Sequence, residues 1–275
     1  MSLSTPRKGY KSVPWLFGKE IEIPEEWEVR KALDISKKIS VGIATSTTKY
    51  IVEKGGIPLL RNQNITEEKI DIQDLLYISK EFAQENFSKQ LHEGDIISTR
   101  TGYVGRSAVV LPEMNGWQTF TTLIITPNIK FIISSYFSRF LNSRYAKKQY
   151  ISFQAGSSQQ NLNAGEISNV LFLVPSLSEQ QKIANILSNV DNLIESTEKV
   201  ITHSKKVKKG LMQKLLTRGI GHTKFKDTRF GKLPEEWNII KIGKISLIID
   251  TPHYTSPNYE SGIPIIRTSD CDTNG

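Results

Sequence analysis

The chain has 275 residues, a formal net charge of +8, and 38% hydrophobic and 9% aromatic residues. This length suits one or two domains with a real core, and the apolar content excludes a disordered chain. A single cysteine, Cys271, excludes an intrachain disulfide framework and a multi-cysteine metal site. The first 20 residues lack the apolar run of a signal peptide, and Pro127 and Lys130 interrupt the most apolar stretch, 120–137. We therefore expect a cytoplasmic protein that does not contact membranes.

An internal repeat is the first informative feature along the chain. The motif Pro-Glu-Glu-Trp occurs at 24–27 and again at 234–237, and Gly-Ile-Pro occurs at 56–58 and again at 262–264. Two ordered matches at nearly one offset, 210 and 206 residues, predict two copies of a whole domain. Residues 1–23 are then an N-terminal extension, and 234–275 are the start of a second, incomplete copy. Whether the chain is a fragment or carries a truncated second domain stays open.

The first copy, 24–176, is predicted to be a mixed α+β domain, because short β-like runs alternate with turn residues. Within it, the apolar residues of 131–150 share one face of a helix, which predicts one helix there. Residues 154–165 are rich in Gly, Ser, Asn and Gln and predict a loop. The runs that we expect to form strands are 57–60, 95–99, 107–111, 119–126 and 169–174.

A long helix is predicted over 177–217, beginning with a capping box between Ser178 and Gln181. Strict heptad spacing keeps a narrow apolar stripe facing a partner helix, and about 40 residues make a rod of roughly 60 Å. The partner is a helix from another chain or from a C-terminal part outside this sequence. The alternative is one long helix packed on its own domain. The predicted coiled-coil interface consists of Ile183, Leu187, Val190, Ile194, Ile201, Leu211 and Leu215, with Thr197, Ser204 and Lys208 as polar members of the seam.

Positive charge is concentrated in the second half of this helix and after it. Residues 199–232 hold eleven Lys or Arg residues and one acid, Asp227, which gives a local net charge of +10. Within this basic segment, we expect residues 218–233 to form a linker between the long helix and the second copy of the domain. A second stretch, 114–165, has five basic residues and no acid. Local basic stripes favour a polyanionic partner, and the alternative is an ordinary solvated helix face.

Motifs of known catalytic chemistry are missing from the sequence. It contains no phosphate-binding G-x-x-x-x-G-K-[ST], no H-E-x-x-H, no G-x-S-x-G and no Asn/Asp-Pro-Pro-Tyr of amino-methyltransferases. The four histidines are far apart in the sequence. We expect the acidic pair Glu67-Glu68 to lie on a solvated surface. We therefore expect a binding module without catalytic or metal-binding residues. Two alternatives are a fragment of a single-chain DNA methyltransferase or nuclease that lacks its catalytic part, and a coiled-coil scaffold that binds only protein.

The ordered motifs of this chain resemble those of the specificity subunit of type I restriction-modification systems. Both Pro-Glu-Glu-Trp segments with their following Gly-Ile-Pro resemble the opening of its target-recognition domain. The similarity runs from about residue 17 to the end of the chain. The other segments that carry it are 94–106, which is similar to the middle motif, and 159–162 with 174–183, which resemble the exit into a spacer helix.

This resemblance implies a non-catalytic DNA-binding subunit. Two recognition domains would each read one half of a bipartite site in double-stranded DNA, held apart by two long antiparallel helices. The helices would dock methyltransferase subunits, which carry S-adenosylmethionine and methylate adenine, and a restriction subunit would join to cut DNA. Only one recognition domain and one spacer helix are complete here, so a homodimer through an antiparallel coiled coil would restore the pattern.

Base reading requires donors and acceptors at base edges, held in register by phosphate contacts. Three polar clusters of the first domain supply such groups, and the alternative for each is an ordinary polar loop. The clusters are Arg61, Asn62, Gln63 and Asn64; Arg100, Tyr103 and Arg106; and Gln154, Ser157, Ser158, Gln159, Gln160 and Asn161. Phosphate contacts are expected from the basic face of Arg139, Arg144, Lys147 and Lys148.

Overall fold

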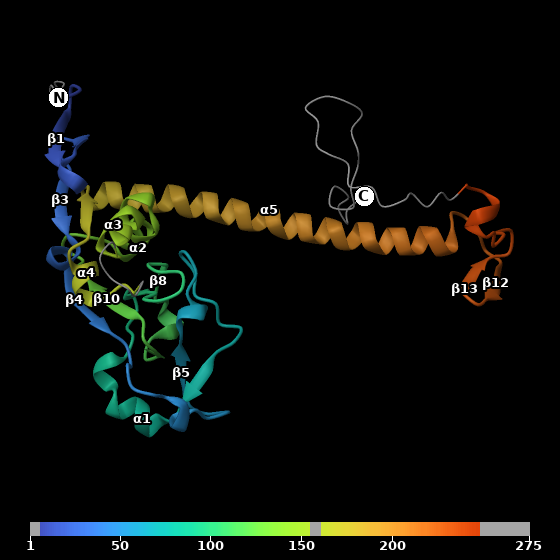
Figure 1. The fold of residues 1–275 in the computed structure, drawn as a ribbon, viewed down its shortest axis with the longest axis horizontal. Coiled ribbons are helices and arrows are strands. Elements are labelled where there is room, and N and C mark those ends of the chain that lie inside the picture. The colour runs from blue at the N-terminus through green and yellow to red at the C-terminus, as the bar shows by residue number, and fades with distance from the viewer. Residues whose placement is uncertain (1–5, 155–160, 248–275) are drawn as a thin grey trace, which may run out of the picture. The chain divides into compact units, whose positions relative to one another are not determined.

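The computed structural model describes residues 6–154 and 161–247. The chain divides into two compact units, Met1–Glu198 and Lys199–Gly275, with the long helix α5 (Leu177–Arg218) running through the boundary. The first unit is a mixed α+β domain, as predicted (Figure 1). Within the described ranges, no helix is both long and apolar enough to cross a membrane.

A four-stranded antiparallel sheet lies at the centre of the first unit, in the order β4-β10-β7-β8. Its strands are rich in Ile and Val, whose branched side chains fit a pleated, half-buried surface. A second sheet has the order β6-β5-β9, with β5 and β9 parallel. The strands of these sheets are β4 (Ser36–Val41), β5 (Ile57–Leu60), β6 (Leu76–Ile78), β7 (Ile96–Ser98), β8 (Ser107–Val109), β9 (Gln118–Thr119) and β10 (Leu123–Pro127).

The predicted helix over 131–150 is wrong in one respect, because the structure has two helices there. They are α2 (Ser134–Asn142) and α3 (Arg144–Gln154), separated by Ser143 in an extended conformation. The Ser143 hydroxyl accepts a hydrogen bond from the amide of Ala146 at 3.4 Å, so this serine caps α3 and ends the run of α2. The other short helix of the β-rich part, α1, spans Lys80–Glu85.

The main core lies between α2, α3 and strand β11 (Leu171–Val174), which pairs with β3 (Glu28–Lys31). Phe172 of β11 meets Phe137 edge-on at 4.5 Å and stacks on Phe140 at 4.4 Å between ring centroids. Aromatic rings in these geometries contribute beyond their buried area. This packing fixes α2 and α3 as one layer over the domain.

The loop predicted over 154–165 is wrong at its end, where residues Ala164–Ser168 form the short helix α4. Asn163 caps this helix by accepting a hydrogen bond from the Glu166 amide at 2.9 Å, and the Glu166 carboxylate accepts one from the Asn163 amide at 2.7 Å. A reciprocal pair of this kind satisfies two amides that would otherwise lack partners. Residues 155–160 of the predicted loop lie outside the described residues.

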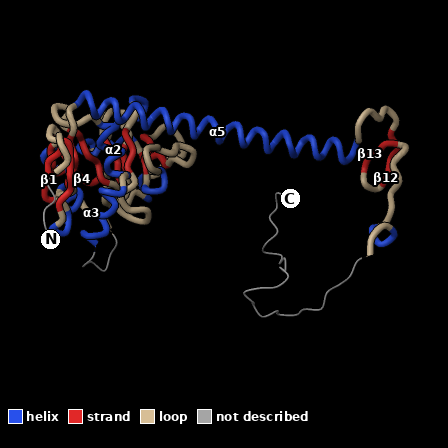
Figure 2. The backbone as a smooth tube through the Cα atoms, turned by 90° about the horizontal axis from the view of Figure 1, so that it is seen from above, coloured by secondary structure: helices blue, strands red, loops and turns tan. Residues whose placement is uncertain are grey.

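Helix α5 confirms the predicted long helix and runs without a break from Leu177 to Arg218 (Figure 2). Its capping group differs from the predicted one. The Ser176 hydroxyl, one residue before the helix, accepts a hydrogen bond from the Glu179 amide at 3.3 Å. Ser178 therefore lies inside the first turn, where a serine cannot serve as the cap.

Each copy of the Pro-Glu-Glu-Trp motif follows a β-hairpin. The first hairpin, β1 (Tyr10–Pro14) and β2 (Glu20–Pro24), packs on the main core through the buried Ile23. The second, β12 (Phe225–Thr228) and β13 (Gly231–Pro234), precedes the second motif. The structural repeat thus begins with a hairpin that precedes the repeated Pro-Glu-Glu-Trp motif. The second Gly-Ile-Pro, at 262–264, lies outside the described residues.

The two repeated tryptophans meet opposite ends of α5. Trp27 donates its indole N–H to the Glu179 carboxylate at 3.0 Å, in the first turn of the helix. Trp237 packs edge-on against His222 at 6.1 Å between ring centroids, just beyond the last turn. Each copy of the motif thus places its tryptophan near one end of the long helix.

Candidate nucleic-acid interface

Hydrogen bonds link the first two predicted polar clusters to each other and to Leu162, the residue that follows the third cluster. Asn62 donates to the Thr101 hydroxyl at 2.9 Å and accepts from the Arg100 amide at 3.3 Å. The Arg100 side chain donates to the Leu162 carbonyl at 3.2 Å, and Leu162 donates its amide to the Arg100 carbonyl at 2.9 Å. Asn62 lies in the loop that follows β5, and Arg100 lies in the loop that follows β7. Leu162 lies just before α4. We call the exposed and half-buried residues Asn62, Arg100, Tyr103 and Arg106 the recognition surface.

The remaining residues of the first cluster hold their own turn. Asn64 is buried, accepts from the Arg61 amide at 3.0 Å and donates to the carbonyls of Asp71 and Asp74 at 3.1 and 3.2 Å. The Arg61 guanidinium pairs with the Asp74 carboxylate at 3.1 Å, and the Gln63 amide donates to the same carboxylate at 3.1 Å. Asn64, the Gln63 amide and one arm of the Arg61 guanidinium therefore shape the loop that carries Asn62, whereas the buried Arg61 Nε has no hydrogen-bond partner among the described residues.

The glycine turn at 102–105 presents an aromatic ring and a guanidinium. Tyr103 is 72% exposed, and the Arg106 guanidinium lies 3.6 Å from the centre of its ring. Gly105 has a φ of +81° and packs against the ring of buried Tyr150. The Thr99 hydroxyl donates to the Tyr103 carbonyl at 2.5 Å, which closes the turn. An exposed Tyr–Arg pair offers both stacking and hydrogen bonding to a nucleic acid.

The predicted phosphate-binding residues separate into two kinds. Arg139 is only 15% exposed, and its guanidinium pairs with Asp191 of α5 at 2.8 Å and donates to the Ser188 hydroxyl at 3.0 Å. It joins α2 to α5 instead of facing solvent. Lys147 pairs with Glu67 at 2.7 Å. Arg144 and Lys148 are the exposed residues of this set. The Arg144 guanidinium lies 5.3 Å from the centre of the Tyr145 ring.

A turn over 66–69 ties this region to α5, and no local pattern in the sequence predicts it. Glu68 has a φ of +64° and accepts hydrogen bonds from the Ser138 hydroxyl at 3.1 Å and from the Asn142 amide. Burial raises the pKa of the Glu68 carboxyl, and the hydrogen bonds from Asn142 and Ser138 oppose this rise. Its neighbour Lys69 pairs with Glu195 of α5 at 2.6 Å. The interpretation of Glu67-Glu68 as a wholly solvated pair is therefore wrong for Glu68.

Most of the third predicted cluster lies outside the described residues. Ser157, Ser158, Gln159 and Gln160 lie outside the described residues, and so does the side chain of Gln154 at the end of α3. Asn161 is half-buried and precedes Leu162, which contacts Arg100. Among the described residues, no group of three or more His, Cys, Asp or Glu is arranged to hold a metal ion.

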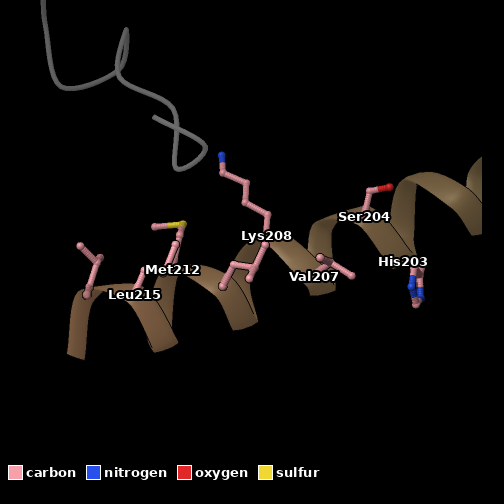
Figure 3. A pocket seen from close by; sticks show the side chains of 8 residues that line it. His203, Ser204, Val207, Lys208, Met212 and Leu215 are labelled. Carbon is pink, nitrogen blue, oxygen red and sulfur yellow. The ribbon is translucent and has the colours of Figure 1, made fainter. Parts of the chain in front are cut away.

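Among the described residues, those that cover the heptad seam of α5 lie at its start. Gln180 and Ala184 are buried there, with Gln180 accepting from the Ile133 amide at 3.0 Å, and Ile183 packs on the main core. The later apolar seam positions, from Leu187 to Leu215, are 41–52% exposed. In the second unit they border an open apolar groove on the helix surface (Figure 3). The residues lining this groove are His203, Ser204, Val207, Lys208, Leu211, Met212, Leu215 and Leu216.

A family model and two relatives match this chain. Residues 24–203 match the family model described as the type I restriction modification DNA specificity domain. The chain is 34% identical over 265 residues to a Methanocaldococcus jannaschii protein named for the specificity subunit of type I restriction enzyme MjaX, covering 90% of this chain and 60% of that protein. It is 25% identical over 267 residues to the EcoKI specificity subunit of Escherichia coli K12, covering 90% of this chain and 54% of the relative. The chain thus spans less than two thirds of the length of these relatives.

A solved structure shares the fold. The crystal structure of the HsdS subunit from Thermoanaerobacter tengcongensis superposes with a TM-score of 0.52 at 18% identity, covering 70% of this chain and 49% of that chain. The same values describe a chain from a structure on complex assembly and conformational transition of the type I R-M system. At this identity the similarity establishes the fold alone, a mixed α+β domain followed by a long helix.

Proposed function

We propose, since this chain belongs to the family of type I restriction-modification DNA specificity domains, that its first unit reads one half of a bipartite site in double-stranded DNA. The observation that carries this proposal is the convergence of Asn62, Arg100 and the segment 161–162 on one surface. Two loops that are distant in sequence meet there, and the backbone of Leu162 anchors the Arg100 side chain. Arginine suits guanine, and the Tyr103–Arg106 pair adds a stacking face. Asn62, whose side-chain amide binds the Thr101 hydroxyl and the Arg100 amide, holds the Arg100 loop in place.

Phosphate contacts would set the register of this reading. Arg144 and Lys148 are exposed on α3 and carry positive charge without offering sequence information. Arg139 and Lys147 act indirectly, because their charges are engaged with Asp191 and Glu67. The recognition surface would thus contact the bases, and the exposed side of α3 would contact the phosphate backbone of the DNA.

The first test uses Arg100→Lys, which keeps the positive charge but removes the planar fork that grips a guanine. We expect the variant to lose about 1–3 kcal/mol of discrimination between target and non-target duplexes. The measurement is enrichment from a pool of random duplexes, followed by titration of the enriched sequence. Arg30→Lys is the matched control, since Arg30 lies over the Phe131 ring at 4.5 Å and pairs with Glu28. An unchanged preference in the Arg100 variant would remove Arg100 from the recognition surface.

Catalysis is proposed to reside in partner subunits. The outer faces of α5 would dock methyltransferase subunits, which hold S-adenosylmethionine, and a restriction subunit would join the assembly in the cytoplasm. Methyl transfer to target DNA is then expected only when a methyltransferase subunit is added to this chain. Transfer by the purified chain alone would favour the alternative, a fragment of a single-chain methyltransferase. Absence of DNA binding even with the partner present would favour a protein-binding scaffold.

Two copies of α5 are proposed to pair antiparallel through the exposed seam. The ten seam positions are symmetric about residue 199, so that Leu187 of one copy faces Leu211 of the other. Charge is complementary as well, because 177–198 holds four acids and one lysine while 199–218 holds seven basic residues and no acid. Asp191 and Lys205 both occupy positions that flank the seam. In this register, Asp191 of one copy lies beside Lys205 of the other. Light scattering of the chain at micromolar concentration should give the mass of a dimer.

A further inference from the structure

The outer edge of strand β8 begins at Ser107, the residue that follows Arg106 of the recognition surface. β8 is the last strand of its sheet and pairs with β7 on one side. Asn142, the last residue of α2, bonds both backbone groups of Ser107. Its side-chain oxygen accepts from the Ser107 amide at 2.9 Å, and its side-chain nitrogen donates to the Ser107 carbonyl at 2.8 Å. One asparagine side chain thus takes the place of a neighbouring strand at the start of β8.

Glu68 determines which way the Asn142 side chain points. The Glu68 carboxylate accepts hydrogen bonds from the Asn142 side-chain nitrogen and from the Ser138 hydroxyl, the latter at 3.1 Å. The backbone amide of Glu68 also donates to the Ser107 carbonyl, at 2.9 Å. An ionised carboxylate only accepts, so the nitrogen of Asn142 must face it, and the oxygen is left for the Ser107 amide. The hydrogen bonds therefore run in one direction, from Glu68 to the first residue of β8.

Backbone hydrogen bonds continue from Ser107 into the glycine turn at 102–105. The Thr99 amide donates to the Arg106 carbonyl at 2.9 Å, and the Arg106 amide donates to the Thr99 hydroxyl at 3.0 Å. The same hydroxyl donates to the Tyr103 carbonyl and closes the turn. A shift of Ser107 would therefore move the Arg106 guanidinium and the Tyr103 ring that it lies against, both of which belong to the recognition surface.

Two ion pairs connect this network to α5 within the first unit. Arg139, three residues before Asn142 on α2, pairs with Asp191 at 2.8 Å. Lys69, the neighbour of Glu68, pairs with Glu195 at 2.6 Å. Both acids lie in the part of α5 that belongs to the first unit. The start of β8 is therefore held relative to the long helix through α2 and through the turn over 66–69.

We propose that Asn142, oriented by Glu68, is a positioning residue for the recognition surface and sets the place of Arg106 and Tyr103 relative to α5. The proposal rests on the proposed function in assigning DNA bases as the target of this surface. Asn142 itself does not contact DNA in this arrangement. It acts through Ser107, whose two backbone groups it holds.

Fold stability alone accounts less well for this arrangement. Glu68 has a φ of +64°, a conformation that is unfavourable for a residue with a side chain. Burial raises the pKa of its carboxyl, with the positive charge of Arg139 opposing this rise and the negative charge of Asp191 adding to it. A raised pKa means that ionisation of Glu68 at neutral pH opposes folding. Strained and partly buried groups of this kind gather at functional sites, where they hold other residues in place.

The test replaces Asn142 with aspartate in the full chain, which keeps the shape but removes the side-chain donor. Asn142→Asp still accepts from the Ser107 amide, but it no longer donates to the Ser107 carbonyl and sets a second carboxylate against Glu68. Enrichment from a pool of random duplexes is followed by titration at a temperature where circular dichroism shows each variant folded. We expect about tenfold less discrimination between the enriched duplex and a scrambled one. Asn142→Ser, whose short side chain lacks one of the two bonding groups, should show the same loss and replaces the aspartate variant if that chain does not fold.

Asn128→Asp is the matched control for the added charge. Asn128 accepts a hydrogen bond from the Lys130 amide at 3.3 Å, which aspartate can also do, and it follows β10 at the sheet end away from the recognition surface. Its discrimination should equal that of the parent. Affinity for the scrambled duplex, which depends on phosphate contacts, should be the same in Asn142→Asp and in this control. Equal loss of discrimination in both variants would overturn the proposal.

Glu68→Gln tests the direction of the hydrogen bonds. The glutamine oxygen can accept from Asn142 while its nitrogen donates to the Ser138 hydroxyl, so this variant should keep the parental discrimination. Its free energy of unfolding should be at least that of the parent, because no charge is buried. In the Asn142→Asp chain, Glu68→Gln should restore part of the discrimination, since its nitrogen can donate to the new carboxylate. Loss of discrimination in Glu68→Gln alone, or no restoration in the double variant, would overturn the role of Glu68.

Hydrogen exchange separates this inference from the proposed function, because it requires no DNA. The amides of Thr99 and Gly105 bond within the turn, and Asn142→Asp should speed their exchange on the order of tenfold, whereas Asn128→Asp should not. Faster exchange in the variant of a parent that enriches no sequence would refute sequence reading but not the positioning of the turn. Enrichment by the parent with parental discrimination in Asn142→Asp, whatever the exchange rate, would refute only the positioning role.

Discussion

Alanine at position 105 is expected to lower the free energy of unfolding by about 3 kcal/mol, through overpacking added to an unfavourable backbone conformation. A Cβ atom on Gly105 would lie 2.2 Å from Cε2 and 2.6 Å from Cδ2 of Tyr150. That ring cannot retreat easily, because Tyr150 is 3% exposed and its hydroxyl donates to the Leu141 carbonyl at 3.1 Å. The damage would reach the site, since the same turn carries Tyr103 and Arg106.

Gly102→Ala provides the matched control for this prediction. Gly102 has a φ of +70°, close to the +81° of Gly105, but nothing lies within 4 Å of an added Cβ. Its substitution should therefore cost only the backbone term, about 1 kcal/mol. Urea denaturation of both variants gives the two values directly. Equal losses would show that contact with Tyr150 adds nothing and that the turn alone accounts for both.

Secondary structure was predictable where the signal was local. The run 57–60 forms β5 with the predicted bounds, because two glycines precede it and polar residues follow it. The long helix was predictable because its period persists over forty residues. The break between α2 and α3 was not, since Ser143 looks like any polar residue on a helix and its capping role depends on where the chain turns.

The site was predictable by residue type but not by geometry. The hydrogen-bonding groups of Arg61 and Asn64 predict base contacts, yet both residues are engaged with Asp74, which lies ten or more residues further along the chain. Arg139 turns to Asp191, a partner on another helix. Such long-range pairs are set by tertiary packing, which local pattern cannot show. Asn62, Arg100 and Tyr103 remain at the surface. They belong to the predicted set, but the sequence does not distinguish them from its other members.

Leu211→Asp is the second large effect that we expect, in this case on self-association. Leu211 is 50% exposed in the single chain, so its replacement should leave the fold of the first unit intact. In an antiparallel pair it would face Leu187, and the two-fold axis would place the change at two sites. Loss of about 2 kcal/mol of burial at each site would weaken the dimer by about 4 kcal/mol, close to 10³-fold.

The control for this effect is Gln213→Asp, which introduces the same charge one half-turn away. Two residues on, position 213 points about 200° from position 211, so it lies on the face opposite the seam. We expect its dimer to persist in sedimentation experiments at concentrations where the Leu211 variant is monomeric. Equal dissociation of both variants would mean that added negative charge, not loss of the apolar seam, separates the copies. A Leu211 variant that stays dimeric would place the self-association surface elsewhere than α5.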